Sequence, residues 1–232
     1  MPLLGPRRLA EAPVAGQRKV DVAYSEIKRA LISGAYEFGA ELSVTELAEE
    51  LGASRQPVME ALKRLESERF VDIVPQVGCR VAVPLPAEVR DFYEVFATME
   101  GLVSRLAAER RTDDDVRYLK EAVNDLNLSR RGSSFDIERY AALNREFHGL
   151  VHRSARSREA RLAAEMYWDR SDFMIASTRP QFWEVNLTRA RSEHRDLYEA
   201  IRGQDAASAR HKAEEHIRSF GQAVADHLAG EG

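Results

Sequence analysis

All six histidines of the 232-residue chain lie after residue 147, and three of them stand where they could share a ligand. His148 follows Asn144 by four residues, so both side chains project from one face of a helix. His194 takes an apolar position within a helical stripe, and His216 borders the apolar residues of the last helical segment. Three imidazoles from three helices, with an oxygen from Asn144, would suit a divalent metal such as Zn²⁺ or Ni²⁺.

The spacing around Gly203 predicts that two of these histidines lie at similar levels along the axes of two neighbouring helices. His194 lies nine residues before the glycine and His216 lies thirteen after it. In an antiparallel helix pair joined there, their levels differ by about 6 Å. The alternative is that these are ordinary core or surface histidines. We assign the other three histidines to solvated faces: His152, His211 and His227. His152 follows His148 by four residues and could also line the same cavity.

Long helices are expected to position these side chains, because residues 87–179 contain no proline and neither does the chain after Pro180. Apolar residues recur at spacings of three and four, as on the buried faces of helices. We predict six helices from Pro86 onward, packed as a bundle. The predicted inner faces are Phe92, Val95, Met99, Leu102 and Leu106; Val116, Leu119, Val123 and Leu126; Tyr140, Leu143, Phe147 and Leu150; Leu187, Ala190, His194, Leu197 and Ile201; and Ala213, Ile217, Phe220, Val224 and Leu228.

The segment from Val20 to Val83 has a different pattern, with three short helices followed by two strands. Strands at Val71–Val74 and Arg80–Val83 flank the turn Pro75-Gln76-Val77-Gly78, which indicates a hairpin. The expected fold class is mainly α: a winged helix-turn-helix followed by an all-helical bundle. The expected division is a mobile tail at 1–19, a winged helix-turn-helix domain at 20–84 and a helical bundle at 85–230.

Two of the short helices form a helix-turn-helix pattern. Ser43 and Glu46 make a capping box, and Gly52 supplies a left-handed stop before a helix that Ser54 is expected to cap. The first turn of that helix would enter the major groove, where Arg reads guanine and Gln reads adenine. The expected DNA contacts are Ser54, Arg55, Gln56, Lys63, Arg64 and, on the wing, Arg80. The alternative is a small helical domain with a solvated charged helix, because residues 1–83 carry 11 basic and 12 acidic side chains.

Composition excludes several classes of protein. The net charge of −4 excludes a protein that coats nucleic acid by bulk charge. One cysteine, Cys79, rules out an internal disulfide framework. No apolar run approaches the roughly 20 residues that span a bilayer. We expect a cytoplasmic protein with no membrane partner.

Residues 47–66, LAEELGASRQPVMEALKRLE, resemble the signature of the GntR family of bacterial transcription regulators. The resemblance extends from about Val20 to Pro84 and implies a winged helix-turn-helix that binds operator DNA as a homodimer, with Gly78 as the glycine of the wing. Two positions depart from the family pattern. Met59 stands where arginine is usual, and Val77 where a polar residue is common, so we expect an unusual operator or weaker binding.

The second half of the chain resembles the FCD effector domain, which defines the FadR-type branch of that family. The motifs are Asn144-Arg145-Glu146-Phe147-His148, Ser192-Glu193-His194-Arg195 and Ala213-Glu214-Glu215-His216. The resemblance implies a bundle of six or seven helices, with Asn144, His148, His194 and His216 as metal ligands beside a small organic acid. Asn144 replaces the commoner aspartate, which predicts weaker metal retention. Phe96 replaces an arginine of the branch, which predicts a more apolar effector pocket.

The expected function is therefore a ligand-responsive transcription regulator, with repression relieved by ligand as the commoner scheme in the family. One alternative is a fatty acyl-CoA sensor without metal. Another is a metal-dependent hydrolase with a general base among Glu146, Glu193 and Glu215. A residue next to a helical ligand points about 100° away from it, which argues against the hydrolase.

Overall fold

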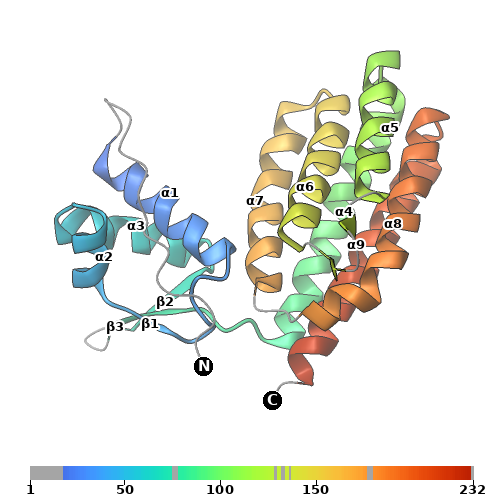
Figure 1. Ribbon diagram of the computed structural model, residues 1–232. Coiled ribbons are helices and arrows are strands. Elements are labelled where there is room, and N and C mark those ends of the chain that lie inside the picture. Colours follow the sequence, from blue (N-terminus) through green and yellow to red (C-terminus); the bar gives the residue numbers. More distant parts are fainter. Residues whose placement is uncertain are drawn as a thin grey trace. The chain divides into compact units, whose positions relative to one another are not determined.

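The computed structural model describes residues 18–74, 78–127, 130–131, 134–135, 137–176 and 180–230. The chain divides into two compact units, one of residues up to Pro84 together with 168–177, the other of 85–167 and the rest (Figure 1). The tail expected at 1–19 lies almost wholly outside the described residues. No helix in the described part of the chain is both long and apolar enough to cross a membrane.

Three helices form the core of the first unit: α1 (Lys19–Ile32), α2 (Val44–Glu50) and α3 (Arg55–Ser67). The predicted inner face of α3 is confirmed, because Val58, Ala61, Leu62 and Leu65 are all buried. Gly52 has φ of 59°, a left-handed conformation that ends α2 and allows the tight turn into α3. The sequence therefore positions α3 as the second helix of a helix-turn-helix.

A three-stranded antiparallel sheet completes the first unit, in the order β1 (Glu41–Leu42), β3 (Gly78–Val81), β2 (Val71–Val74). The hairpin is confirmed, but its second strand begins at Gly78 and not at Arg80. The pairing of Val74 with Gly78 explains the shift, since it places the turn at 75–77, outside the described residues. The short strand β1 was not predicted.

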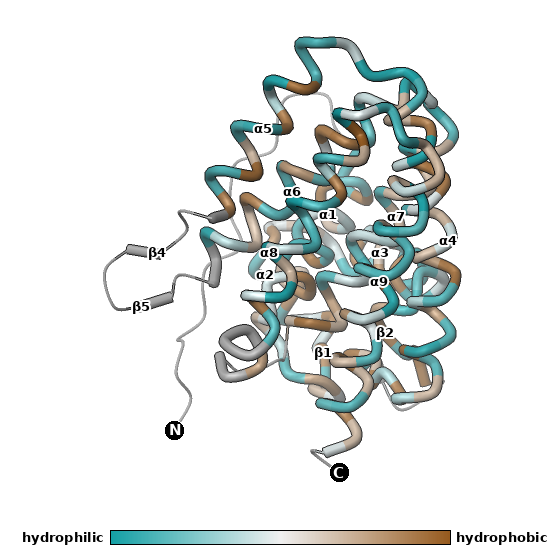
Figure 2. Tube along the Cα trace, turned by 90° about the vertical axis from the view of Figure 1, so that its right-hand side faces the viewer, coloured by the Kyte–Doolittle hydropathy of each residue, from teal (hydrophilic) through white to brown (hydrophobic). Residues whose placement is uncertain are grey.

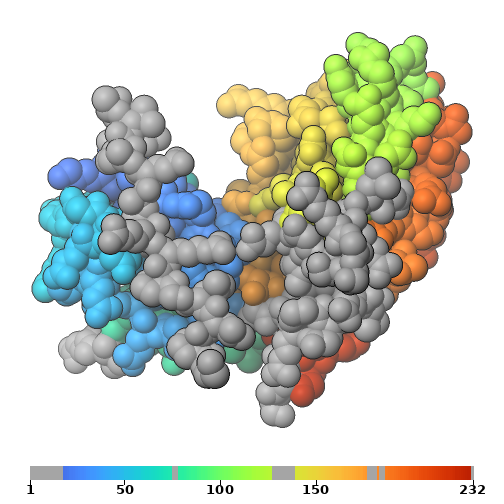
Figure 3. All heavy atoms as spheres, viewed as in Figure 1, coloured from blue at the N-terminus to red at the C-terminus, as the bar shows by residue number. Residues whose placement is uncertain are grey.

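The second unit contains six described helices, as predicted. They are α4 (Pro86–Arg110), α5 (Asp113–Asn127), α6 (Ile137–Ser154), α7 (Arg158–Ile175, of which residues from Trp168 on cluster with the first unit), α8 (Pro180–Arg202) and α9 (Ala206–Ala229). Two short strands, β4 (Arg130–Arg131) and β5 (Ser134–Phe135), pair between α5 and α6. Within this unit α5 packs against α6 and α8, and the space-filling view shows α5 in green beside α8 in orange (Figure 3).

Helix α4 packs most extensively against α9. A Cβ atom built on Gly221 would lie 2.2 Å from Cγ of Tyr93, so only glycine allows this approach of the two helices. The buried face of α4 consequently runs through Val89, Tyr93, Phe96, Glu100 and Val103.

The predicted inner face of α4 is therefore partly wrong. Val95 is 51% exposed and Leu102 is 39% exposed, whereas their neighbours Phe96 and Val103 are fully buried. Apolar and polar residues alternate along the bundle helices in the hydropathy view (Figure 2), so spacing alone allows more than one assignment of the buried face.

Candidate metal centre and DNA-facing surface

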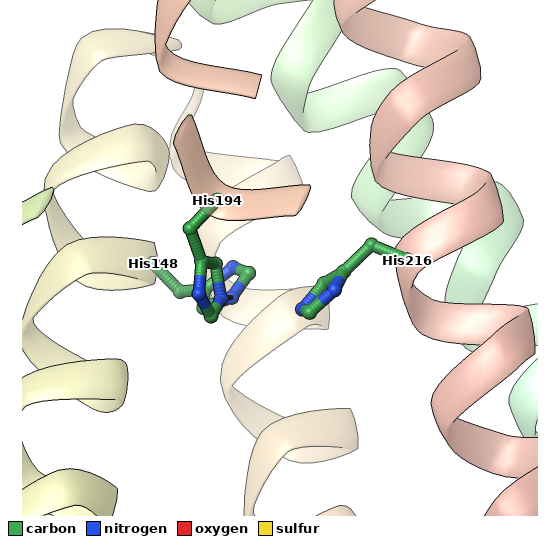
Figure 4. Close-up of side chains that lie close together, drawn as sticks. All are labelled: His148, His194 and His216. Atoms are coloured by element: carbon green, nitrogen blue, oxygen red, sulfur yellow. Dashed lines mark hydrogen bonds between the residues drawn. The ribbon is translucent and has the colours of Figure 1, made fainter. Parts of the chain in front are cut away.

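Three imidazoles from three helices converge in the second unit: His148 from α6, His194 from α8 and His216 from α9. One ring nitrogen of each lies within 4.8 Å of the others, and all three side chains are buried. Nε2 of His148 lies 3.2 Å from Nε2 of His194. Figure 4 shows the three side chains pointing toward one another. The predicted convergence of these histidines is confirmed.

The environment of His148 and His194 favours their neutral forms. Burial lowers the pKa of His148 to about 4, despite the opposing effect of Glu100. Burial, together with the neighbouring rings of His216 and His148, holds the pKa of His194 well below its usual range. A neutral imidazole has a free lone pair, which is the form that binds a metal.

The donor set fits a divalent ion. Nδ1 of His194 is buried and has no hydrogen-bond partner among the described residues, an unusual state for a polar atom in a protein core. Nitrogen ligands from three histidines are typical of Zn²⁺ and related ions. The site therefore has the donor chemistry of a divalent metal centre.

Glu100 of α4 lies behind one of the three rings. Its side chain is 1% exposed, with Oε2 3.5 Å from Nδ1 of His148 and Oε1 2.8 Å from Nε2 of His152. Burial alone would raise the pKa of this carboxyl, but the two imidazoles outweigh it and hold the pKa well below its usual range. Glu100 is therefore a buried carboxylate anion next to the candidate centre.

Glu193 of α8 lies behind a second ring. Its Oε2 is 2.7 Å from Nδ1 of His216, and its Oε1 accepts a hydrogen bond of 3.3 Å from the hydroxyl of Ser219. Burial raises the pKa of Glu193, yet the hydrogen bond and charge of His216 lower it further, so the net shift is downward. Because an ionised carboxylate only accepts, Nδ1 of His216 carries a proton, and Nε2 is the nitrogen that faces away from this hydrogen bond.

Sequence reasoning missed both carboxylates as partners of the site. Glu100 interrupts an apolar helix face, which was the one available signal, since buried glutamates are rare unless paired. The assignment of His152 to a solvated face is wrong, because this ring is buried against Glu100. His211 is exposed, as predicted.

Asn144, the fourth predicted ligand, lies one turn before His148 on α6 and is partly buried. Phe96 is fully buried and stacks on Tyr167, with ring centroids 5.7 Å apart and planes 11° from parallel. Phe96 also precedes Glu100 by one turn of α4, so an aromatic surface lies on the helix face that carries this carboxylate. Of the aromatic residues that follow along the chain, Trp168 is buried, and the side chain of Trp183 lies outside the described residues.

In the first unit, the amino-terminal turn of α3 is open to solvent. Ser54, Arg55 and Gln56 are all exposed. Ser54 occupies the N-cap position of α3, as predicted, but its side chain makes no capping hydrogen bond. The prediction is therefore correct for the position and wrong for the hydrogen bond. The hydroxyl and the first amide groups of the helix are consequently available to an anion such as a phosphate.

The other predicted DNA contacts differ in their surroundings. Lys63 and Gly78 are exposed. Arg64 stacks over the ring of Tyr24 at 3.6 Å and lies 3.4 Å from Glu68, so it already has partners within the fold. Arg80 lies across the hairpin from Asp72 at 3.6 Å, with half of its side chain exposed.

Met59 lines a groove of about 990 Å³ between α3 and the wing, together with Gly78 and Arg80. Its thioether stands where the family pattern predicts a cation, so this groove has one positive charge fewer than that pattern implies. Val77, the other departure, lies outside the described residues.

Comparisons with known proteins agree with this architecture. Residues 19–81 match the bacterial regulatory proteins of the gntR family, and residues 91–219 match the FCD domain. An uncharacterized HTH-type transcriptional regulator of Agrobacterium vitis is 31% identical over 145 residues, which is 60% of this chain and 82% of that protein. A Paenarthrobacter nicotinovorans protein named "Probable D-xylose utilization operon transcriptional repressor" is 25% identical over 97% of this chain and 94% of its own.

The solved structure of Escherichia coli McbR/YncC has the same fold, with a TM-score of 0.71 and 23% identity over 88% of this chain and 95% of that one. The relatives are named as transcription regulators and not as enzymes. Because the two family matches together cover most of the sequence, the chain belongs to the GntR family of bacterial regulatory proteins, as a DNA-binding transcription regulator with a carboxy-terminal FCD domain.

Proposed function

We propose that this regulator senses a small organic acid through a divalent metal, Zn²⁺ or Ni²⁺, held in its FCD domain. The observation that carries the proposal is the cluster of His148, His194 and His216, whose buried side chains bring one ring nitrogen each within 4.8 Å of the others. Asn144, one turn before His148, is the fourth ligand of the proposal. A bound ion would supply a positive charge that attracts the carboxylate of the effector.

The DNA side of the proposal rests on the first turn of α3. Arg55 and Gln56 are exposed and have the donors that read guanine and adenine in the major groove. Ser54 and the amide groups behind it would hold a phosphate, and Lys63, Arg64, Gly78 and Arg80 would contact the backbone of the duplex. A homodimer would present two such heads to two half-sites of an operator.

Regulation requires that the effector favour one arrangement of the DNA heads over another. The chain passes between the two units at Pro84–Leu85 and again within α7, whose residues from Trp168 on belong to the DNA-binding unit. These are two of the three points at which the chain crosses between the units, and each is a covalent route by which a change near the histidines would reach α3. Repression relieved by the effector is the scheme we propose.

The test is a fluorescence-anisotropy titration of the full-length protein with a duplex enriched by it from a random DNA library. We expect saturable binding that Arg55→Ala weakens by about 5–150-fold, the equivalent of about 1–3 kcal/mol. The control is Arg195→Ala, at an exposed arginine of α8, which should bind like the wild type.

The effector half of the proposal is tested in the same assay. Metal-loaded protein is titrated with a panel of small organic acids, and at least one acid should release the duplex. The proposal fails if a folded protein enriches no duplex, or if chelation of the metal leaves the response to every active acid unchanged. Release by long-chain acyl-CoA from metal-free protein would favour the alternative sensor.

A further inference from the structure

Two of the three imidazoles in the cluster have a glutamate behind them, on the side away from the shared centre. Glu100 lies 3.5 Å from Nδ1 of His148, and Glu193 lies 2.7 Å from Nδ1 of His216. In both rings Nε2 is then the nitrogen left for the cluster, which agrees with the 3.2 Å approach of Nε2 of His148 to Nε2 of His194.

Each glutamate is itself held in place by a second partner. Oε1 of Glu100 lies 2.8 Å from Nε2 of His152, a buried ring on the same helix as His148. Oε1 of Glu193 accepts from the hydroxyl of Ser219, which lies on α9 one turn after His216. Carboxylates fixed in this way orient the imidazoles that they contact and fix which nitrogen carries the proton.

The charges of the site explain why two carboxylates are needed. Three neutral imidazoles and the neutral side chain of Asn144 would leave the two positive charges of an ion uncompensated. Glu100 lies 3.5 Å from Nδ1 of His148 and Glu193 lies 2.7 Å from Nδ1 of His216, so two acidic side chains stand directly next to the ligands. They therefore restore the charge that an aspartate in place of Asn144 would have supplied in part.

We propose that Glu100 and Glu193 are the positioning residues of the metal centre, which set the tautomers of His148 and His216 and neutralise the ion from behind its ligands. This inference rests on the proposed metal site. It differs from the expectation drawn from Asn144 alone, because it predicts firm metal retention in the wild-type protein. Nδ1 of His194 has no hydrogen-bond partner among the described residues, so the proposal assigns no positioning carboxylate to this ligand.

The experiment measures the affinity of full-length protein for Zn²⁺ by competition with a chromophoric chelator. Glu100→Gln and Glu193→Gln keep the shape of each side chain and remove its charge. We expect each variant to bind Zn²⁺ about 10–100-fold more weakly than the wild type. The control is Glu215→Gln, at a 66% exposed glutamate that directly precedes His216 in the chain, and it should bind like the wild type.

Two further measurements distinguish the proposed positioning role of the two glutamates from a purely structural role. The melting temperature of the metal-free variants shows whether the loss of affinity merely follows a loss of folding. Long-range ¹H–¹⁵N spectra of histidine-labelled protein report the tautomers, and His216 should lose its fixed Nδ1–H form in Glu193→Ala, which removes the acceptor oxygen that a glutamine keeps. If the buried change in Glu100→Gln prevents folding, Glu193→Gln at the more accessible carboxylate carries the test.

The outcomes distinguish this inference from the function on which it rests. Weaker binding in both variants, with the control unchanged, supports it. A wild type that binds Zn²⁺ while both variants bind equally well overturns the inference and leaves the metal site standing. A wild type that takes up neither Zn²⁺ nor Ni²⁺ overturns the metal site, and the inference with it.

Discussion

His148 and His194 are buried imidazoles whose pKa values lie below those of histidines in an unfolded chain. The unfolded state titrates near 6.5, whereas His148 in the folded protein titrates at about 4. Between these values the unfolded state binds more protons, so acid favours unfolding. The contribution of these residues is complete above about pH 6.5 and is lost as the pH falls toward 4.

We therefore expect His148 alone to cost the metal-free protein about 2 kcal/mol of unfolding free energy between pH 7 and pH 5, and His194 to add to this loss. Urea denaturation at the two pH values measures this loss. His194→Gln should reduce the dependence on pH, whereas His211→Gln, at an exposed ring, should leave it unchanged. A stability that is equal at pH 5 and pH 7 would contradict the assignment of neutral buried rings.

Phe96 sets the second expectation at the scale of one residue. The ring is buried against Phe92 and Tyr167 where the family pattern has arginine, so the proposed effector has one carboxylate and an apolar body. Phe96→Arg should shift the preference toward acids with two carboxylates, by about tenfold in the ratio of affinities, the size of one charge-assisted contact. Isothermal titration with matched mono- and dicarboxylic acids measures this ratio.

Val95→Arg is the matched control, because it adds the same charge at the neighbouring, exposed position of α4. A wild type that prefers dicarboxylic acids, or a control that shifts the preference as much as Phe96→Arg, would refute the role given to the aromatic surface.

The packing of α4 on α9 is the element-scale feature that most constrains the bundle. Gly221→Ala would place a methyl group 2.2 Å from Cγ of Tyr93, so the helices must separate or the ring must move. We expect a loss of about 1–3 kcal/mol, or more, from this overpacking. Thermal denaturation checks it.

Gly149→Ala on α6 is the comparison, since its new methyl group would meet only the guanidinium end of Arg153, at 3.6 Å. That variant should be unchanged or more stable by up to about 1 kcal/mol, because alanine favours a helix interior. Equal melting temperatures for the two variants would show that α4 and α9 do not approach as described.

The sequence predicts some elements better than others, for physical reasons. The inner face of α3 is correct because local spacing and the stop at Gly52 agree. The face of α4 is partly wrong because Val95 and Leu102 have the spacing of buried residues, while the small residues Gly101 and Gly221 decide where α9 lies. Spacing along one helix does not contain that information.

The residues of the candidate metal centre also differ in how well the sequence predicts them. Three histidines on apolar faces predict their own convergence, and the structure confirms it. Glu193 stands next to His194 in sequence but contacts His216 from the following helix, a pairing that only the packing of α8 on α9 determines. Partners from other helices are therefore the part of a site that spacing does not reveal.

At the scale of the whole molecule, one helix takes part in both units. Residues 158–167 of α7 cluster with the FCD unit and residues from Trp168 on cluster with the DNA-binding unit. Within the latter, Phe173 contacts the rings of Phe38 and Phe70, with centroids 5.3 and 5.1 Å apart. A continuous helix transmits a rotation or shift along its length more directly than a flexible linker, which suits a regulator.

The metal content of the purified full-length protein is the most direct test of the account. After incubation with Zn²⁺ or Ni²⁺ and gel filtration, elemental analysis should find about one ion per protomer in the wild type, as for a three-histidine site. His194→Ala should retain almost none, while His211→Ala, at an exposed ring, should retain as much as the wild type. A wild type that emerges without metal, or a His194→Ala protein that keeps it, would contradict the central claim.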